Sequence, residues 1–399
     1  MRNRRLAVAV LVALGVSACQ ATRAQSPQSQ DPPARTAATT ATTTTATTTT
    51  TTTTATTSTT VPVTAPADPA CPGTACVTIT LTGDVLLHQP LWAQARRDGA
   101  GRYDFSRILA AQRPFVTAGD LAFCHLETPL APPSGPFRGY PSFAVPPQIA
   151  TALRHTGYDA CTTASNHTLD GGAAGVQRTL DDLDAAGLRH TGSARSASEA
   201  GRVLTFDVRG TRVALLAYTY GLNGISPDHA WRVNLIDGAR IRGDARAARR
   251  AGADVVVVAL HWGTEYQHDP TAQQRTLAEQ LLADPDITLV YGHHAHVVQP
   301  VQRLHDKWVV YGLGNAVAAQ STSRPDTYRG LLVRVQLVRD PTGRWRGGRL
   351  DWVASGIATA PAYRWADLHR SPSAVAATGR YVDRLGADRQ GAAPWGTAP

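Results

Sequence analysis

The fold is decided by the stretch Tyr291-Gly292-His293-His294-Ala295-His296-Val297-Val298-Gln299-Pro300. It follows an apolar run at residues 287–290 that is typical of a short buried strand, and Gly292 closes that strand. The histidines should therefore lie on a loop at the carboxyl end of a strand, where α/β sheets bind their ligands. If the loop is extended, His294 and His296 point the same way and suit one metal ion. A solvated, histidine-rich loop is the alternative.

Polar side chains also stand at the ends of four other predicted strands. The strands cover residues 77–81, 121–124, 158–163 and 254–260, and the polar residues are, in the same order, Asp84, Glu127, Asn166 and His261. Each signal is weak alone, because Gly-Asp turns and buried structural histidines are common. Their recurrence at equivalent positions predicts that they gather with the histidine loop at one rim of the sheets.

Carboxylate, amide and imidazole groups in this combination are typical ligands of Mn²⁺, Fe or Zn²⁺. No thiolate, the ligand that marks a closed structural zinc site, belongs to this set. Two such ions would hold a hydroxide and clamp both oxygens of an in-line phosphoryl displacement. The sequence therefore predicts one or two divalent ions as cofactors.

A second histidine motif, Asn166-His167-Thr168-Leu169-Asp170, lies on the turn between a strand and a helix. Here Asn166 would be a ligand, and His167 would be an acid–base group that the Asp170 carboxylate orients. The motif also fits a helix N-cap and turn, since Asn, Asp and Gly favour such places. The sequence alone leaves both interpretations open.

The remaining pattern predicts an α/β domain over residues 71–365. Its expected helices are at 149–156, 175–186, 237–251 and 271–283, with a hairpin at 203–208 and 212–218 and later strands at 308–311, 331–338 and 349–353. The proline- and glycine-rich stretch 131–147 is long enough to form a lid or rim. Residues 366–399 are weakly patterned, and we expect nothing catalytic there.

The N-terminal part of the chain predicts export. Residues 1–18 have a basic start, an apolar run too short for an ordinary membrane span, and small residues before Cys19. This pattern is typical of a lipoprotein signal peptide, with Cys19 as the lipidated residue and a membrane anchor. A plain secretory signal is the alternative. Residues 19–70, rich in Thr, Ala and Pro, predict a disordered tether.

Four further cysteines could form two disulfides in an exported protein. Cys71 and Cys76 could close a small loop at the domain entrance, and Cys124 and Cys161 could bridge neighbouring strands. Buried free thiols are the alternative for the second pair.

The net charge of +9 does not predict nucleic-acid binding. The arginines are scattered, and no basic run is interleaved with aromatic residues. A weak attraction to anionic lipid, wall polymer or an acidic substrate is compatible with this charge.

Taken together, these motifs resemble the CapA family of capsule and poly-γ-glutamate synthesis proteins, which are built on the calcineurin-like metallophosphatase fold. The resemblance covers residues 77–360. It is carried by Thr82-Gly83-Asp84, His125-Leu126-Glu127, Ala164-Ser165-Asn166-His167, His261-Trp262-Gly263, the histidine loop and Tyr311-Gly312-Leu313-Gly314-Asn315.

The resemblance implies a four-layer α/β/β/α sandwich with a metal site at the sheet ends. It implies that the metal ligands are Asp84, Glu127, Asn166, His261, His294 and His296, and that His167, held by Asp170, is a general acid. The sequence departs from the family pattern at Leu86, where metallophosphatases commonly have His, and at His125, Ser165 and Ala295, which replace Asn, Asn and Pro. Leu86 leaves open whether two ions bind.

Two functions follow from the resemblance. One is a metal-dependent hydrolase or transferase that acts on a phosphoester or a γ-glutamyl polymer at the cell surface. The other is a non-catalytic subunit that binds or guides an anionic polymer beside a membrane synthase, with the lipid anchor and tether holding it there.

Overall fold

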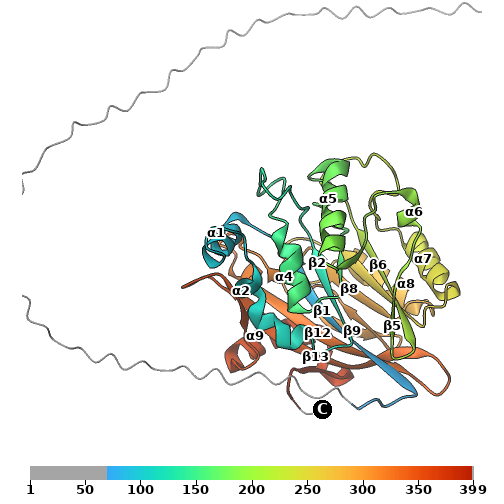
Figure 1. Cartoon of the computed structure of the whole chain (residues 1–399). Helices are drawn as coiled ribbons and strands as arrows, with labels where there is room; N and C mark the ends of the chain where they lie inside the picture. The colour runs from blue at the N-terminus through green and yellow to red at the C-terminus, as the bar shows by residue number, and fades with distance from the viewer. Residues whose placement is uncertain (1–69, 398–399) are drawn as a thin grey trace, which may run out of the picture. The chain divides into compact units, whose positions relative to one another are not determined.

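The computed structural model describes residues 70–397. The predicted signal peptide, Cys19 and nearly all of the predicted tether lie outside the described residues. Figure 1 shows the described part as strands covered by helices on both sides.

A nine-stranded sheet forms the first half of the core, with strands in the order β14-β13-β12-β1-β2-β3-β4, while β11 pairs with β1 and β15 pairs with β13. The strands β1 to β4 run parallel, and β12, β13 and β14 continue the sheet antiparallel. Their bounds are β1 Ala75–Val85, β2 Leu121–Leu126, β3 Ala160–Thr162, β4 Arg189–Thr191, β11 Asn315–Val317, β12 Arg329–Arg339, β13 Trp345–Ala358, β14 Arg364–Asp367 and β15 Ala392–Pro394.

A six-stranded sheet forms the second half, in the order β5-β6-β7-β8-β10-β9. The neighbours β6, β7, β8 and β10 are parallel, and the two edge strands are antiparallel. Their bounds are β5 Leu204–Val208, β6 Thr211–Thr219, β7 Val255–His261, β8 Leu289–His293, β9 Val301–Leu304 and β10 Lys307–Val310. The central strand β7 is buried along its whole length, as its run of valines predicts.

Helices cover the outer faces of both sheets. Their bounds are α1 Gln89–Asp98, α2 Ser106–Leu109, α3 Arg113–Val116, α4 Gln148–Thr156, α5 Gly172–Ala185, α6 Ala197–Ala200, α7 Gly238–Arg250, α8 Ala272–Ala283 and α9 Pro372–Val382, with 3₁₀ turns at Ala110–Gln112, Pro325–Tyr328, Asp383–Leu385 and Asp388–Gln390. Sequence signals start the two long helices of the second sheet: Asp237 caps α7, and Thr271 and Gln274 form a capping box on α8.

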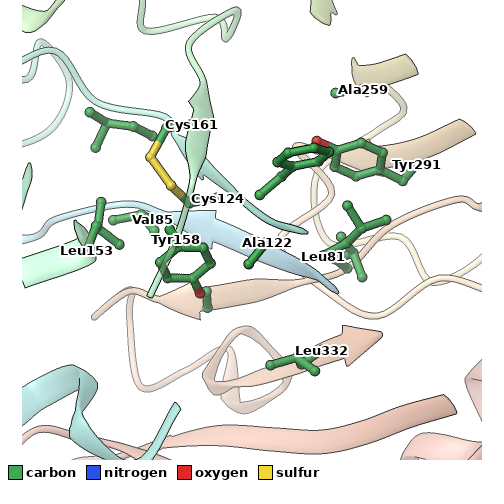
Figure 2. Packing of buried hydrophobic residues seen from close by; sticks show 14 of the residues in the cluster. Leu81, Val85, Ala122, Cys124, Leu153, Tyr158, Cys161, Ala259, Tyr291 and Leu332 are labelled. Carbon is green, nitrogen blue, oxygen red and sulfur yellow. A yellow bond between two sulfur atoms is a disulfide. The ribbon is translucent and has the colours of Figure 1, made fainter. Parts of the chain in front are cut away.

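Apolar packing defines four layers. One face of the second sheet packs against α7 and α8 in a core of Ala, Val, Leu and Ile side chains. Its other face joins the first sheet in a larger core, in which Ala259 and Tyr291 of the second sheet lie near Leu81 and Ala122 of the first (Figure 2). Because α4 and α5 contribute to the same larger core from the far side of the first sheet, the predicted α/β/β/α sandwich is confirmed.

Both cysteine pairs are disulfide-bonded in the structure. Cys71 bonds to Cys76 at the entrance to β1. Cys124 of β2 bonds to Cys161 of the neighbouring strand β3, within the core (Figure 2). The second bond therefore joins two of the strands that end at the predicted site.

Strand register brings distant residues into two rows. Across the first sheet Asp84 pairs with His125, and His125 pairs with Thr162. Across the second sheet His261 pairs with His293. Since the sheets are stacked, the carboxyl ends of their parallel strands bring these rows together, as expected for a ligand site in an α/β fold.

The structure differs from the sequence prediction in the histidine loop. Both His294 (φ 88°) and His296 (φ 57°) have left-handed backbones, so the prediction of an extended loop is wrong. The ring centroids of the two histidines are nevertheless only 6.1 Å apart, because the tight turn brings them together.

The weakly patterned segment from residue 366 onward adds α9 and β15 to the fold. The strand β15 pairs with β13, and Trp395 is buried against Phe115. Among residues 70–397, no helix combines the length and apolar character that crossing a membrane requires.

Candidate metal centre

Six buried side chains that the sequence nominated lie at one end of the two stacked sheets. They come from four strand ends and the histidine loop: Asp84, Glu127, Asn166, His261, His294 and His296. Each has at most a few per cent of its surface exposed. The fold therefore brings together residues that lie more than two hundred positions apart in the chain.

Asp84 links the first sheet to the histidine loop. Its Oδ1 lies 2.7 Å from Nδ1 of His293, and its Oδ2 lies 3.1 Å from Nδ1 of His296 and accepts a bond from the backbone N–H of His294 (3.2 Å). Burial raises the pKa of Asp84, but the bonds and charges of His293 and His296 outweigh it and hold the pKa well below its usual range. Asp84 is therefore an ionised carboxylate in the interior.

Glu127 lies in the middle of the site without hydrogen-bond partners. Its Oε1 is 3.7 Å from Nε2 of His296 and 3.9 Å from Nε2 of His261, and neither carboxylate oxygen makes a hydrogen bond to any of residues 70–397. Burial raises its pKa to about 7, although the charge of His296 opposes the shift. A buried carboxylate without partners is costly, and a bound cation would remove that cost.

Asn166 and His261 form the other wall of the site. Nε2 of His261 lies 2.8 Å from Oδ1 of Asn166. The amide group of Asn166 donates to Oδ1 of Asn223 (3.2 Å), which turns its own oxygen toward His261. Burial, together with the charges of His294 and His125, lowers the pKa of His261 well below its usual value, so its imidazole is neutral and able to bind a metal.

The two loop histidines differ in charge. Burial and the charge of His296 lower the pKa of His294 to about 3, and its Nδ1 is buried without a partner in the described part of the chain. Burial also opposes charge on His296, but the charge of Glu127 and the bond to Asp84 outweigh it and raise its pKa to about 9. The loop thus places one neutral imidazole and one proton-holding imidazole beside the carboxylates.

The donor set fits a divalent metal ion. Three groups have donor atoms within 4.8 Å of one another: Asp84, Glu127 and His296; Glu265, His294 and His296; and Asp84, His125 and His293. The unpartnered oxygens of Glu127 and the unpartnered Nδ1 of His294 point to the same conclusion, since a cation would satisfy them. Oxygen and imidazole donors suit Mn²⁺, Fe or Zn²⁺, as the sequence predicted.

His167 and Asp170 form a pair beside these groups. Nδ1 of His167 donates to Oδ2 of Asp170 at 2.7 Å, and the same oxygen accepts the backbone N–H of Phe143 at 2.7 Å. The ring of Phe143 packs edge-on against His167 with centroids 4.8 Å apart. The imidazole is thereby held with Nδ1 engaged and Nε2 left for another group.

A cleft of about 660 Å³ opens onto the site. Its more buried lining residues, called its floor below, include Leu86, His88, His167 and His296, and its other lining residues are Tyr140, Phe143, Glu265, Tyr266, Ala319, Gln320, Ser321, Ser323 and Arg324. Tyr140 is 79% exposed and belongs to the 131–147 stretch, which therefore supplies part of the rim that the sequence predicted. The guanidinium of Arg324 lies 3.8 Å above the Tyr266 ring.

The structure adds residues that the sequence reasoning missed. His293 contacts Asp84, Asn223 orients Asn166, and Glu265 lies within reach of His294 and His296. His293 belongs to the same histidine triplet, so that signal was present in the sequence. Asn223 had none, because it stands on the loop after β6 with no motif around it.

The fold and the site define a class of protein: a two-sheet α/β protein with a buried carboxylate–histidine cluster at its strand ends. The family model described as "Bacterial capsule synthesis protein PGA_cap" matches residues 78–320, more than half of the chain. The chain belongs to this family.

Two relatives carry related names. The chain is 30% identical to the PGA biosynthesis protein CapA of Bacillus subtilis over 201 residues, which cover 50% of this chain and 52% of that protein. It is 23% identical to the capsule biosynthesis protein CapA of Bacillus anthracis over 259 residues, covering 62% of this chain and 61% of the relative. The chain thus spans only about half to three fifths of these relatives.

Among solved structures, the chain is similar to the calcineurin-like phosphoesterase YfkN of Bacillus subtilis. The alignment has a TM-score of 0.46 and 13% identity, and it covers 76% of this chain and 97% of that one. We infer no activity of this chain from a similarity of this size.

Proposed function

We propose that this protein is a metal-dependent hydrolase or transferase that acts on an anionic capsule polymer such as poly-γ-glutamate, or on a phosphoester, at the cell surface. One observation carries the proposal. Among residues 70–397, Glu127, His293 and His294 present buried donor atoms without hydrogen-bond partners, and their cluster adjoins an oriented His–Asp pair. Such an arrangement is expensive in a protein that binds no ion.

The ion would be held by the six residues that the sequence nominated. Glu127, centrally placed between His261 and His296, could serve two positions, with Asp84 and His296 on one side and Asn166, His261 and His294 on the other. When bound, a divalent ion supplies a Lewis acid and lowers the pKa of water to near neutrality.

The residues of the chain supply the proton handling. Asp170 fixes the tautomer of His167, because its oxygen accepts the Nδ1 proton. Nε2 is then the atom that can hold or deliver a proton at the floor of the cleft, where His167 lies. The family's assignment of His167 as general acid is consistent with this geometry.

The cleft suits an extended, anionic substrate. It holds Arg324, for which the described residues provide no carboxylate partner within ion-pair distance, and it holds neutral donors on Gln320, Ser321 and Ser323. A guanidinium in such a setting recognises carboxylates and phosphates alike. A γ-glutamyl polymer and a phosphoester are therefore both candidate substrates of this cleft.

The family and the N-terminal sequence support a proposal for the cellular setting. We propose export, lipid anchoring at Cys19 facing outward, and work beside a membrane synthase, because the relatives are named for capsule and PGA biosynthesis. The tether predicted at residues 19–70 would give the domain reach from the membrane.

Elemental analysis of the purified protein, paired with a screen of phosphoesters, γ-glutamyl peptides and poly-γ-glutamate, tests the enzyme proposal. We expect bound Mn, Fe or Zn, and loss of both metal and turnover in His294→Ala. The matched control is His305→Ala, since His305 is exposed and pairs with Glu279 away from the site. Undiminished turnover by thoroughly chelated protein would overturn the proposal.

A second candidate is a non-catalytic subunit that binds the polymer. It is favoured by Leu86, an apolar residue on the cleft floor at the position where the wider fold family carries a ligand. This alternative expects poly-γ-glutamate to bind equally to wild type and His167→Ala, with no turnover by either. A measurable turnover that His167→Ala abolishes would exclude it.

A further inference from the structure

Two buried side chains connect by hydrogen bonds to the proposed metal ligand His261. Nδ1 of His125 lies 2.8 Å from Oγ1 of Thr162, and Nε2 of His125 lies 3.0 Å from Nδ1 of His261. This hydrogen-bond chain starts at the end of β3, crosses β2 and passes to β7 in the other sheet. Neither Thr162 nor His125 belongs to the proposed ligand set, so their bonds need a separate explanation.

Without an ion, the direction of this chain is fixed from its inner end. Asn223 accepts from the amide N–H of Asn166, so the Asn166 oxygen faces Nε2 of His261 at 2.8 Å. An oxygen at that distance requires His261 to donate from Nε2. Nδ1 of His261 then accepts from Nε2–H of His125, and Nδ1 of His125 accepts the hydroxyl proton of Thr162.

An ion bound at His261 requires the opposite direction. Nε2 of His261 faces Glu127 and Asn166, so it is the atom that would ligate and it must lose its proton. The neutral ring of His261 then carries its proton on Nδ1 and donates a hydrogen bond to Nε2 of His125. The ring of His125 in turn carries its proton on Nδ1 and donates a hydrogen bond to Thr162. The Thr162 hydroxyl has a second acceptor within reach, the carbonyl of Cys124 at 3.4 Å.

We propose that Thr162, His125 and His261 form a hydrogen-bond chain whose direction reverses when a divalent ion binds, and that His125 is a positioning residue for the ligand His261. The inference rests on the metal centre proposed above. Each imidazole carries one proton before and after the reversal. Nε2 of His261 gives its proton to water, and Nδ1 of His125 receives a proton from water. The three hydrogen-bonded residues therefore neither gain nor lose a proton overall.

Histidine is suited to this position because a tautomer change reverses both of its bonds without moving a heavy atom. The surroundings hold the ring in place. His293 stacks on His125 with centroids 4.0 Å apart and planes inclined by 17°. His125 is also 1% exposed, which leaves little room for another rotamer. An asparagine or glutamine amide would have to rotate within this packed space to make the same exchange.

The tautomers themselves provide the first test. Nitrogen-15 NMR of histidine-labelled protein distinguishes Nδ1–H from Nε2–H rings, and assignment uses His125→Gln and His261→Gln. We expect both rings to be Nε2–H in chelated protein and Nδ1–H after saturation with Zn²⁺. Identical tautomers in the two states, with Zn²⁺ bound, would overturn the inference. Failure of the wild type to take up Zn²⁺ would instead overturn the proposed function.

Variants provide the second test, read as the dissociation constants of Co²⁺ and Zn²⁺ in competition with a chelator. His125→Phe keeps the ring but removes both nitrogens, and we expect roughly 10- to 100-fold weaker binding, as for other groups that orient a metal-bound histidine. His125→Gln, whose Oε1 can accept from Nδ1 of His261, should recover most of the loss. The visible spectrum of bound Co²⁺ should change in His125→Phe and return in His125→Gln.

Neighbouring threonines supply a matched pair of controls. Thr162→Val removes the partner of His125 and should weaken Co²⁺ binding, but less than His125→Phe does. Thr163→Val removes a hydroxyl that bonds to Thr191 and Ser193 and not to His125, and it should leave binding unchanged. Equal affinity in wild type, His125→Phe and Thr162→Val would contradict the inference. If His125→Phe does not fold, the threonine pair and the wild-type tautomers decide the question.

Discussion

The Asp84 side and the Glu127 side of the site are built on different principles. On the Asp84 side, both carboxylate oxygens already have partners in His293, His296 and the backbone of His294, and the cleft residue two positions later is Leu86. On the Glu127 side, neither oxygen of Glu127 has a hydrogen-bond partner, and Nδ1 of His294 has none. Among the described residues, the Asp84 side therefore leaves one buried atom without a partner, Nε2 of His293, whereas the Glu127 side leaves three.

This difference indicates which of the two positions an ion should occupy first. A cation at the Glu127 side satisfies donor atoms that have nothing else, so most of the interaction is net gain. A cation at the Asp84 side has to displace hydrogen bonds and lacks the ligand that His would supply at position 86. We therefore expect one tightly bound ion and, at most, one ion that binds more weakly.

The largest effect is expected from Glu127→Gln. Because Glu127 lies between both proposed ion positions, its loss should abolish tight binding and weaken the second position. We expect the affinity of the tight position to fall by more than roughly a thousandfold, or about 4 kcal/mol. Isothermal titration of chelated protein with Zn²⁺ measures it. A variant that keeps one tight ion would show that Glu127 is not the shared ligand.

The same variant should have the opposite effect on stability without metal. Burial raises the pKa of Glu127 to about 7, above its unfolded value, so ionising it on going from pH 5 to pH 8 costs folding free energy. Glutamine carries no such cost. Chelated Glu127→Gln should therefore be more stable than chelated wild type at pH 8, by roughly 1–3 kcal/mol, and should lose this advantage near pH 5. Urea unfolding at the two pH values measures the difference.

A second prediction separates proton handling from ion binding. Asp170→Asn removes the carboxylate that accepts from His167, but it touches neither side of the metal site. We expect turnover to fall roughly 100-fold or more, while the metal content stays at the wild-type value. Parallel elemental analysis and steady-state kinetics give both numbers. Loss of metal in this variant would mean that the His–Asp pair supports the ion site structurally.

Much of this architecture could be predicted from the sequence because strand ends are local features. The valine run marks the buried strand β7, and Gly292 lies one residue before the end of β8, so the sequence locates both strand ends closely. Parallel strands end at the same edge. That reasoning correctly placed Asp84, Glu127, Asn166 and His261 in one region. It needed no knowledge of side-chain contacts.

The remaining details depend on tertiary packing and could not be predicted. The bond between Asp84 and His293 joins residues 209 positions apart. Positive φ at His294 and His296 is unusual outside glycine and is maintained only because surrounding contacts fix the loop. The chain from Thr162 through His125 requires the register between β2 and β3, and no periodicity in the sequence sets that register.

A third prediction restores what the Asp84 side lacks. Leu86→His places an imidazole at the cleft floor, two residues after Asp84, and a ligand contributing about 1.4 kcal/mol would tighten the weaker ion position roughly tenfold. The tight position should be unaffected. Leu86→Met, which keeps an apolar side chain of similar volume, is the matched control. Titration with Mn²⁺ followed by electron paramagnetic resonance counts both positions.

The smallest expected effect is on the number of protons that the protein releases when an ion binds. His296 holds its proton to about pH 9 because Glu127 and Asp84 outweigh the effect of burial, whereas a metal ligand must be deprotonated. Ion binding at pH 7.5 should therefore release protons, and affinity should rise with pH until His296 loses its proton unaided near pH 9. Calorimetry in two buffers of different ionisation enthalpy measures the number released. In His296→Gln the number should fall by about one, since the proton-holding group is gone. An unchanged number would assign the released proton to Glu127 and make the Glu127 side the origin of the pH dependence.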